Sequence, residues 1–401
     1  MSLSAANILL RYYAVSLVYA LAGGFLAGVY PIFLRSRGLN QLEINSVLAA
    51  YFVVTFLTDV PTGAFADALG RRLSFVVGCV LRCAAFALYF VSHTYVVFLV
   101  AETIDAVGTT FCNGAVDAWG VDALDDAGFA KTKDHLFSRI TQLSSLGFMT
   151  TAVVGAFVAS IDIAWPWLLG AAGFAVSGFM GALLRERAIG GAPLQLVDVP
   201  AAIAARIRQG IRQGFALRSV RLLSLAEGIL LAAWAPYWLE WPLLFGDSYG
   251  VGVWVVGWIF CLLALAHMLG AEIVVRAGMR SAHRPVALGA LVLGAGVMLI
   301  VAGSLAANPA HALVALVLMN VLSGAHEPLA RSWFNDEVAP EERATMLSFR
   351  SAVATAGGSL GLLLGGYVVD LRGIPFHWRM AGTLALLAVP CYLALRSRRT
   401  S

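Results

Sequence analysis

Long apolar runs follow one another along the whole chain, and they constrain its fold more than any other feature. A helix needs about 20 consecutive apolar residues to cross a bilayer, and twelve segments of about this length are present. They are continuous rather than alternating in polarity, which excludes the strands of a β-barrel. The sequence therefore predicts an all-α membrane protein with twelve transmembrane helices. These lie near 9–33, 44–65, 73–92, 95–118, 137–160, 164–184, 222–244, 251–273, 286–306, 311–333, 346–369 and 379–395.

The scarcity of charge supports the same class of protein. Of 401 residues, 12% are charged and 60% are hydrophobic, whereas a soluble protein carries about 25% charged residues. This excludes a water-soluble enzyme, a disordered chain and a secreted disulfide scaffold. All five cysteines lie in apolar runs, so we interpret them as buried apolar side chains rather than disulfide or metal ligands. The first run is too long for the apolar part of a cleavable signal peptide.

Basic residues predict the orientation of the chain, because cytoplasmic loops of membrane proteins are enriched in Lys and Arg. The connections on one side contain only Arg35, Arg37, Arg372 and Arg379. We therefore expect the other side to be cytoplasmic and both termini to lie there. The modest net charge of +4 gives no indication of nucleic-acid binding. The cytoplasmic set comprises Arg71, Arg72, Lys131, Lys133, Arg185 to Arg221, Arg276, Arg280, Arg284, Arg343, Arg396, Arg398 and Arg399.

One connection is much longer than the others, and it predicts the domain organisation. Residues 185–221 are rich in arginine and contain Pro193 and Pro200. Within them, 201–217 has the pattern of an amphipathic helix that lies on the inner leaflet. We expect six-helix bundles at 1–184 and 222–401, joined by this cytoplasmic linker.

The two halves also repeat each other at a nearly constant offset. Residues 114–117 (Gly-Ala-Val-Asp) correspond to 324–327 (Gly-Ala-His-Glu), 210 positions later. Arg11 and Arg221 are again 210 apart, and Arg139, Gly147 and Gly155 correspond to Arg350, Gly358 and Gly366 at an offset of 211. Such a parallel repeat predicts two pseudo-symmetric bundles with a cleft between them, which rocking exposes alternately to each side.

A motif between the second and third segments is typical of a known protein family. Residues 63–72 read Gly-Ala-Phe-Ala-Asp-Ala-Leu-Gly-Arg-Arg. This resembles the G-x-x-x-D-x-x-G-R-R/K signature of the major facilitator superfamily, as do the six-plus-six repeat and the long central loop. Residues 59–63, 118–122 and 343–345 are similar to a bacterial branch of drug and metabolite exporters. The resemblance implies a multi-pass transporter in a bacterial cytoplasmic membrane.

The resemblance also implies a conformational latch on the cytoplasmic side. In the family, the motif aspartate lies against the N-terminus of segment eleven, where the helix dipole favours an anion. Gly63 would allow close helix contact and Gly70 a tight turn, and Arg71 would pair with Asp122 or Asp117. We therefore assign the latch to Gly63, Asp67, Gly70, Arg71, Arg72 and Asp122.

Three ionisable residues near the bilayer centre form the predicted proton-coupling site. Arg82 precedes His93 by eleven residues, and Asp105 follows Thr94 by eleven. Both therefore lie about 16 Å from the outer surface. This equal depth permits an ion pair of Arg82 with Asp105 or with Glu102, and it leaves one carboxylate under-compensated and suited to carry a proton. The alternative is a structural ion pair that orders the helix hairpin.

Polar and aromatic positions predict a substrate cavity. Segment four carries polar residues from Glu102 to Asp117 at spacings of three or four, and segment ten carries a similar row. Two such faces line a shared cavity, or alternatively form hydrogen bonds between helices within each half. The predicted lining is Tyr19, Asn113, Asp117, Glu227, Trp234, Trp238, Asn320 and Glu327.

These patterns predict a monomeric secondary active transporter, driven by the proton gradient, that exports a small amphipathic molecule by alternating access. We expect no cofactor, no metal and no enzymatic activity, because a Walker loop and a nucleophile–base set are absent from the sequence. One alternative is a proton-coupled importer of a nutrient or anion, with Arg82, Arg331 and Arg350 as substrate ligands. The other is a membrane sensor that binds a ligand without transport.

Overall fold

The computed structural model describes residues 4–129, 134–186, 217–278, 283–339 and 342–395. Helices are the only regular secondary structure in these ranges. Nearly all of the expected amphipathic helix at 201–217 lies outside them, as do Lys131, Lys133 and Arg280. The chain forms two compact units. Unit 1 comprises Met1–Arg37, Ala50–Val199 and Gly252–Phe260, and unit 2 comprises Gly38–Ala49, Pro200–Val251 and Cys261–Ser401.

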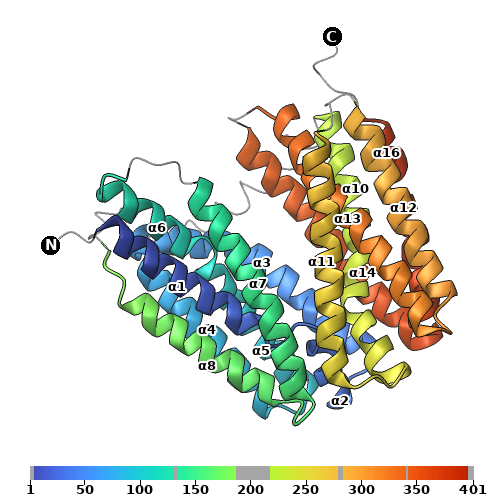
Figure 1. Ribbon diagram of the computed structural model, residues 1–401, viewed down its shortest axis with the longest axis horizontal. Coiled ribbons are helices and arrows are strands. Elements are labelled where there is room, and N and C mark those ends of the chain that lie inside the picture. Colours follow the sequence, from blue (N-terminus) through green and yellow to red (C-terminus); the bar gives the residue numbers. More distant parts are fainter. Residues whose placement is uncertain (1–3, 130–133, 187–216, 279–282, 340–341, 396–401) are drawn as a thin grey trace. The chain divides into compact units, whose positions relative to one another are not determined.

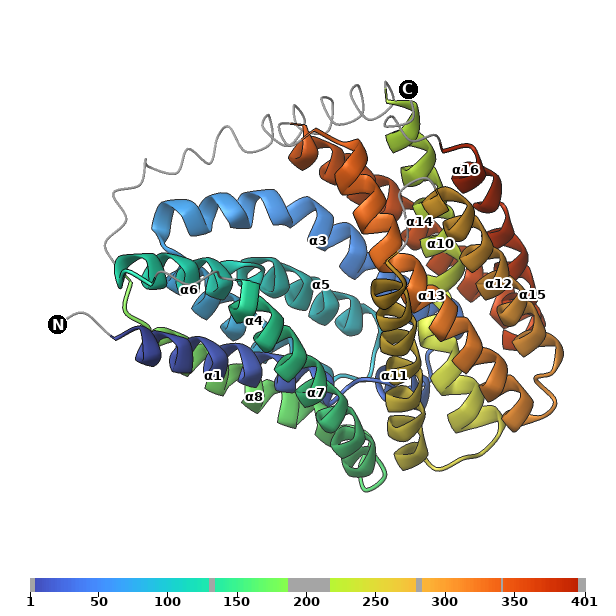
Figure 2. The same ribbon diagram turned by 45° about the horizontal axis from the view of Figure 1, so that its top comes forward.

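Unit 1 is built on a tightly packed set of helices in which α4 contacts both α5 and α8, and α1 contacts both α7 and α8 (Figure 1). Figure 2 shows α1 and α8 side by side from a second direction. Its helices are α1 (Ala5–Gly24), α2 (Tyr30–Ser36), most of α3 (Gln41–Leu69), α4 (Arg71–Val91), α5 (Tyr95–Cys112), α6 (Ala115–Asp126), α7 (Asp134–Ala159) and α8 (Trp165–Ala182).

Unit 2 has α10 packed along α14, and α12 packed against both α13 and α15. A short π-helix, η2, continues α10 directly. The helices are α10 (Arg218–Leu243), η2 (Leu244–Ser248), most of α11 (Val253–Ala277), α12 (Arg284–Ser304), α13 (Pro309–Glu337), α14 (Arg343–Arg372), α15 (Ile374–Leu386) and α16 (Val389–Leu393).

Ten of the described helical stretches are long and apolar enough to cross a membrane. The sixth expected segment forms α8, of 18 residues, and the twelfth forms α15 and α16, of 13 and 5 residues. The chain is therefore a multi-pass helical membrane protein, as the apolar runs predict. The predicted boundary at 185–221 stays a prediction.

Two segments expected to be continuous are broken. The run at 9–33 divides into α1 and α2, with a turn that contains Gly28 at φ 76°. The run at 95–118 ends its first helix at Cys112, and α6 begins after Gly114, whose φ is 68°. A positive φ of this size favours glycine, because other residues place Cβ too near the backbone. Apolar periodicity does not reveal such a break, because both pieces are equally apolar.

Glycines bring α4 and α5 into close contact around the buried charges. A Cβ at Gly108 of α5 would lie 2.8 Å from Cγ of Arg82 and 2.9 Å from the carbonyl oxygen of Gly78. Both distances are shorter than ordinary van der Waals contact. The absence of side chains at these positions is therefore what allows Arg82 to lie flat against α5.

We predict that Gly108→Ala destabilises the protein, since the added methyl must push α4 and α5 apart, at a cost of about 1–3 kcal/mol. The midpoint of thermal unfolding in detergent should fall. Gly23→Ala is the matched control, because its Cβ would meet Phe148 at an ordinary 3.7 Å. An equal effect of both substitutions would contradict the packing argument.

Candidate functional site

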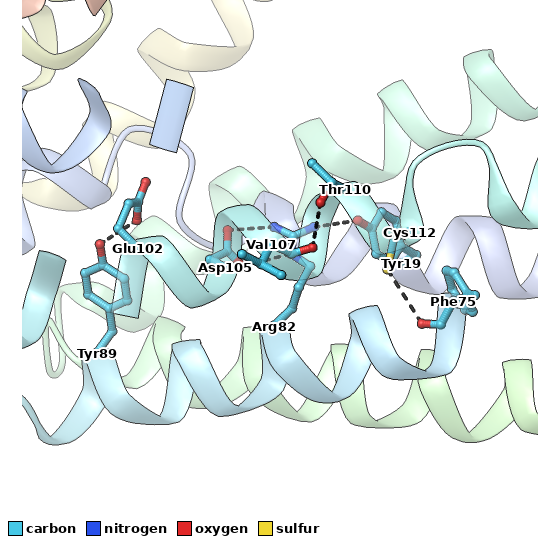
Figure 3. Close-up of polar contacts among 9 residues, drawn as sticks. All are labelled: Tyr19, Phe75, Arg82, Tyr89, Glu102, Asp105, Val107, Thr110 and Cys112. Atoms are coloured by element: carbon cyan, nitrogen blue, oxygen red, sulfur yellow. Dashed lines mark hydrogen bonds and ion pairs between the residues drawn. The ribbon is translucent and has the colours of Figure 1, made fainter. Parts of the chain in front are cut away.

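Arg82 and Asp105 form a buried ion pair between α4 and α5 (Figure 3). Nε of Arg82 lies 2.8 Å from Oδ1 of Asp105, and Nη2 lies 3.3 Å from Oδ2. The side chains are 13% and 10% exposed. The structure thus forms the first of the two pairs that equal depth permits, and the guanidinium binds both carboxylate oxygens.

Aromatic side chains enclose the same guanidinium. Its Nη1 donates to the hydroxyl of Tyr19 at 2.7 Å, and its central carbon lies 4.1 Å from the centre of the Phe174 ring. A cation above an aromatic face is attracted by the ring quadrupole. Tyr19, predicted to line the substrate cavity, is therefore held inside unit 1, with its ring packed on Phe75 and Phe174.

Glu102 lies on the same face of α5 but has different partners. The hydroxyl of Tyr89 donates to Oε2 of Glu102 at 2.5 Å, and the hydroxyl of Tyr30 lies 3.4 Å from that of Tyr89. The Tyr89 ring stacks on Trp167 with centroids 3.9 Å apart. Glu102 is 6% exposed, and it makes no ion pair with any described residue. It is a buried carboxyl group whose hydrogen-bonding partners are phenols.

The polar row of segment four does not form one continuous face, which corrects the prediction. The break at Gly114 places Asp117 on a separate helix, where it accepts a hydrogen bond from the hydroxyl of Tyr12 at 2.6 Å. Asn113 and Asp117 are exposed, whereas Glu102 and Asp105 are buried within unit 1. The row therefore divides into an enclosed pair of acids and an exposed pair of polar residues.

The motif between α3 and α4 is organised by an acid that sequence reasoning missed. Arg71 pairs with Asp122 at 3.1 Å, one of the two partners predicted, and its contact with Asp67 is longer, at 4.0 Å. Glu186 accepts hydrogen bonds from the backbone nitrogens of Arg71 and Arg72 at 2.8 and 3.1 Å. It thereby caps the N-terminus of α4, where a negative charge is favoured.

The structure supports only some of the other contacts predicted for the latch. Gly70 has a φ of 109°, as a tight turn requires. A Cβ at Gly63 would meet no described atom within 4 Å, so the described residues do not supply the close contact predicted for it. The expected contact of Asp67 with the start of α14 joins the two units and stays a prediction.

Unit 2 contains a second arginine–carboxylate pair. Nε of Arg350 on α14 donates to Oε2 of Glu227 on α10, and the two side chains are 18% and 15% exposed. The guanidinium lies 5.1 Å from the centre of the Phe334 ring. Glu227 was predicted to line the cavity, and the structure places it in this pair.

The remaining predicted cavity residues of unit 2 differ in exposure. Asn320 is buried and donates to the hydroxyl of Tyr237 at 3.0 Å. Glu327 is half exposed and pairs with Arg331 at 2.6 Å and His267 at 3.5 Å. The rings of Trp234 and His326 meet edge to face. Trp238 is 42% exposed.

Glu240, near the end of α10, and His377, in the first turns of α15, were not predicted as a site. Nδ1 of His377 lies 2.8 Å from the carboxylate of Glu240, and both side chains are buried. His377 falls just before the apolar run expected at 379–395, outside the predicted transmembrane segments. Among the residues that the structure describes, no group of three or more His, Cys, Asp or Glu could hold a metal ion.

These features define a polytopic helical membrane protein whose units each enclose an arginine–carboxylate pair. The model of the Major Facilitator Superfamily matches residues 12–239 and 222–401. The chain belongs to this superfamily of transporters.

Individual relatives are distant. The chain is 22% identical over 161 residues to the quinolone resistance protein NorA of Staphylococcus aureus (strain MRSA252), which is 40% of each chain. It is similar in structure to the nucleoside transporter NupG, with TM-score 0.72 and 15% identity over 97% of this chain and 98% of that one. A POT family transporter in complex with a thioalcohol conjugated peptide gives TM-score 0.72 and 12% identity over 98% and 96%. At these identities, the solved structures establish the fold alone.

We predict that Arg82→Gln is strongly destabilising, because it leaves Asp105 buried without a cation, at a cost of about 3–5 kcal/mol. Adding Asp105→Asn should recover part of this loss, which a thermal-unfolding double-mutant cycle measures. Arg276→Gln is the control, because the Arg276–Glu272 pair is exposed on one helix and such pairs contribute about 0–1 kcal/mol. Equal losses at Arg82 and Arg276 would refute the assignment.

Proposed function

We propose that this transporter exports a small amphipathic molecule in exchange for protons, and that Glu102 is its proton-binding group. The observation that carries the proposal is the burial of Glu102 among phenols, with no cation among its described partners. The neighbouring Asp105 is bound at both oxygens by Arg82. Two acids on one helix thus have opposite environments.

The difference in partners determines which acid can exchange a proton. Arginine stays protonated in proteins, so Asp105 always has a positive charge as its partner. An ionised carboxylate without a cation is costly in an apolar interior. Glu102 is therefore neutral while enclosed and ionises when water reaches it. This ranking revises the sequence prediction, in which Asp105 was named first, and it gives Arg82 and Asp105 a structural role.

The phenols beside Glu102 supply a route for its proton. Tyr89 bonds to the carboxyl group, and the hydroxyl of Tyr30 lies 3.4 Å from that of Tyr89. A hydroxyl both donates and accepts hydrogen bonds. The chain from Glu102 through Tyr89 to Tyr30 therefore connects the buried acid to the start of α2.

Substrate class and direction are supported by the relative and by the residue types. NorA is named for quinolone resistance, and quinolones are flat, amphipathic molecules. We propose that Asn113, Asp117, Trp234, Trp238 and Glu327 contribute to substrate binding during the cycle. Tyr19, Glu227 and Asn320, also predicted to line the cavity, are enclosed by partners within their units. Acids and aromatic rings attract neutral or cationic compounds. We place the protein, as a monomer, in a bacterial cytoplasmic membrane.

Import is the second candidate function. NupG is a nucleoside transporter and the POT family structure contains a bound peptide. Arg331 is 70% exposed and its ion pair is with Glu327 on its own helix, so it is open to an anionic ligand. Arg82 and Arg350 are enclosed in ion pairs, which disfavours their role as substrate ligands.

The deciding experiment uses purified protein in liposomes loaded with a pH-sensitive dye, with an acidic interior. Norfloxacin, uridine and a dipeptide are added outside in turn. Proton efflux that starts with norfloxacin supports antiport of an amphipathic drug. Protons that accompany uridine or the dipeptide inward establish symport, and they would overturn the export proposal.

We predict that Glu102→Gln abolishes compound-driven proton movement in this assay, because the amide cannot bind and release a proton in the working pH range. The variant should still bind norfloxacin, which is measured by the quenching of tryptophan fluorescence. Thr103→Ala, an exposed neighbour on α5, is the control and should transport normally. Full proton exchange in Glu102→Gln would remove Glu102 from the mechanism.

A further inference from the structure

We infer that Glu240 and His377 form a second proton-binding site, in unit 2, separate from the site at Glu102. Its role in the transport cycle rests on the proposed proton coupling, whereas its existence does not.

The pair joins two helices in a fully enclosed place. Glu240 lies near the end of α10, and His377 lies in the first turns of α15. Nδ1 of His377 is 2.8 Å from Oε1 and 2.8 Å from Oε2 of Glu240. The side chains are 0% and 3% exposed. A Cβ at Gly365 of α14 would lie 2.9 Å from Nε2 of His377, so this glycine makes room for the ring.

The partners of Glu240 distinguish it from the arginine-bound acids. One nitrogen faces both carboxylate oxygens, and Oε1 has no hydrogen-bond partner among the described atoms. A buried carboxylate oxygen without a donor is unfavourable, and such a group calls for an explanation. With one proton between Oε2 and Nδ1 the pair carries a single negative charge, and a second proton on Nε2 makes it neutral. Unlike arginine, imidazole exchanges its proton near neutral pH.

The other charged groups on the packed helices are exposed or bound to other partners. On α10, the hydroxyl of Tyr237 accepts from Asn320 of α13. On α15, Arg379 is exposed and stacks on Phe376. On α14, Asp370 accepts from the backbone nitrogens of Gln41 and Leu42, Tyr367 is 55% exposed, and Arg350 is paired with Glu227. The remaining charged groups of the packed helices are Arg343 and Arg372 of α14, Arg218 and Arg221 of α10, Asp247 of η2, and Arg284 of α12, which pairs with Asp336.

The segment around Glu240 has fewer backbone hydrogen bonds than the rest of α10. Pro236 and Pro242 lie on either side of it, and η2 follows at Leu244–Ser248. Each proline removes a backbone hydrogen bond of the helix, and π-helical turns are common at functional sites. Bending here separates Glu240 from His377 and admits water, and each group then exchanges protons independently. Proton exchange at this site is thereby coupled to the shape of α10.

The test is the titration of His377 in the full chain, labelled with ¹⁵N-histidine and reconstituted in lipid. His377→Gln assigns the signals. We expect the His377 ring to change protonation between mildly alkaline and mildly acidic pH in the parent, and to lose this titration or shift it in Glu240→Gln. Glu272→Gln, an exposed glutamate paired with Arg276, is the matched control and should leave the His377 signals unchanged. An invariant His377, or a titration that Glu240→Gln does not alter, overturns the inference.

A second measurement keeps the inference testable if Glu240→Gln does not fold. The variant Glu240→Gln/His377→Gln places two amides that can hydrogen-bond to each other, and it should take up fewer protons per chain than the parent over the same range. Equal uptake overturns the inference. Titration at His377 without proton-coupled flux refutes the proposed function alone. If proton-coupled flux depends on Glu102 but His377 does not titrate, this inference is refuted and the proposed function is not.

Discussion

The ion pair between Arg82 and Asp105 is the interaction on which the interior of unit 1 depends. An isolated charge in an apolar interior is costly, and this cost is offset only where the geometry supplies a counter-charge and hydrogen bonds. Arg82 receives both from Asp105, and Tyr19 and Phe174 complete its enclosure. Gly78 and Gly108 permit the close approach of α4 and α5 that the pair requires. The close packing of α4 on α5 and the formation of the ion pair therefore depend on each other.

One buried acid in each unit forms an ion pair with an arginine, and the other buried acids have partners of a different chemical type. Asp105 and Glu227 are held by Arg82 and Arg350. Glu102 is held by a phenol, and Glu240 is held by an imidazole. Phenol and imidazole partners do not impose a permanent positive charge on the acid. The proposed division into structural and exchangeable carboxyl groups therefore rests on the partner of each acid, since all four acids are largely buried.

The sequence predicted the membrane class, the approximate spans and, as one of two alternatives, the pairing of Arg82 with Asp105, because apolar length and helical rise are local properties. It did not predict the break at Gly114, since a left-handed glycine leaves hydropathy unchanged. The cap of α4 by Glu186 was also missed, because 115 positions separate Glu186 from Arg71 and only folding brings them together. His377 was missed for a related reason: it precedes an apolar run, and its partner Glu240 lies on a helix far away in the sequence. The roles of the predicted site residues stay proposals, because membrane depth identifies costly groups but not their partners.

Comparison of the repeat positions explains why the two units can serve different purposes. Gly114, at a positive φ, precedes α6 at the break between α5 and α6, whereas Gly324 lies inside the continuous helix α13. Asp117 then accepts from Tyr12, while Glu327 pairs with Arg331 and His267. The repeat thus preserves the positions of small residues but not the partners of the acids. We propose that an enclosed acid whose partner is not arginine exchanges its proton, and in unit 1 that acid is Glu102, one turn of helix away from Asp105.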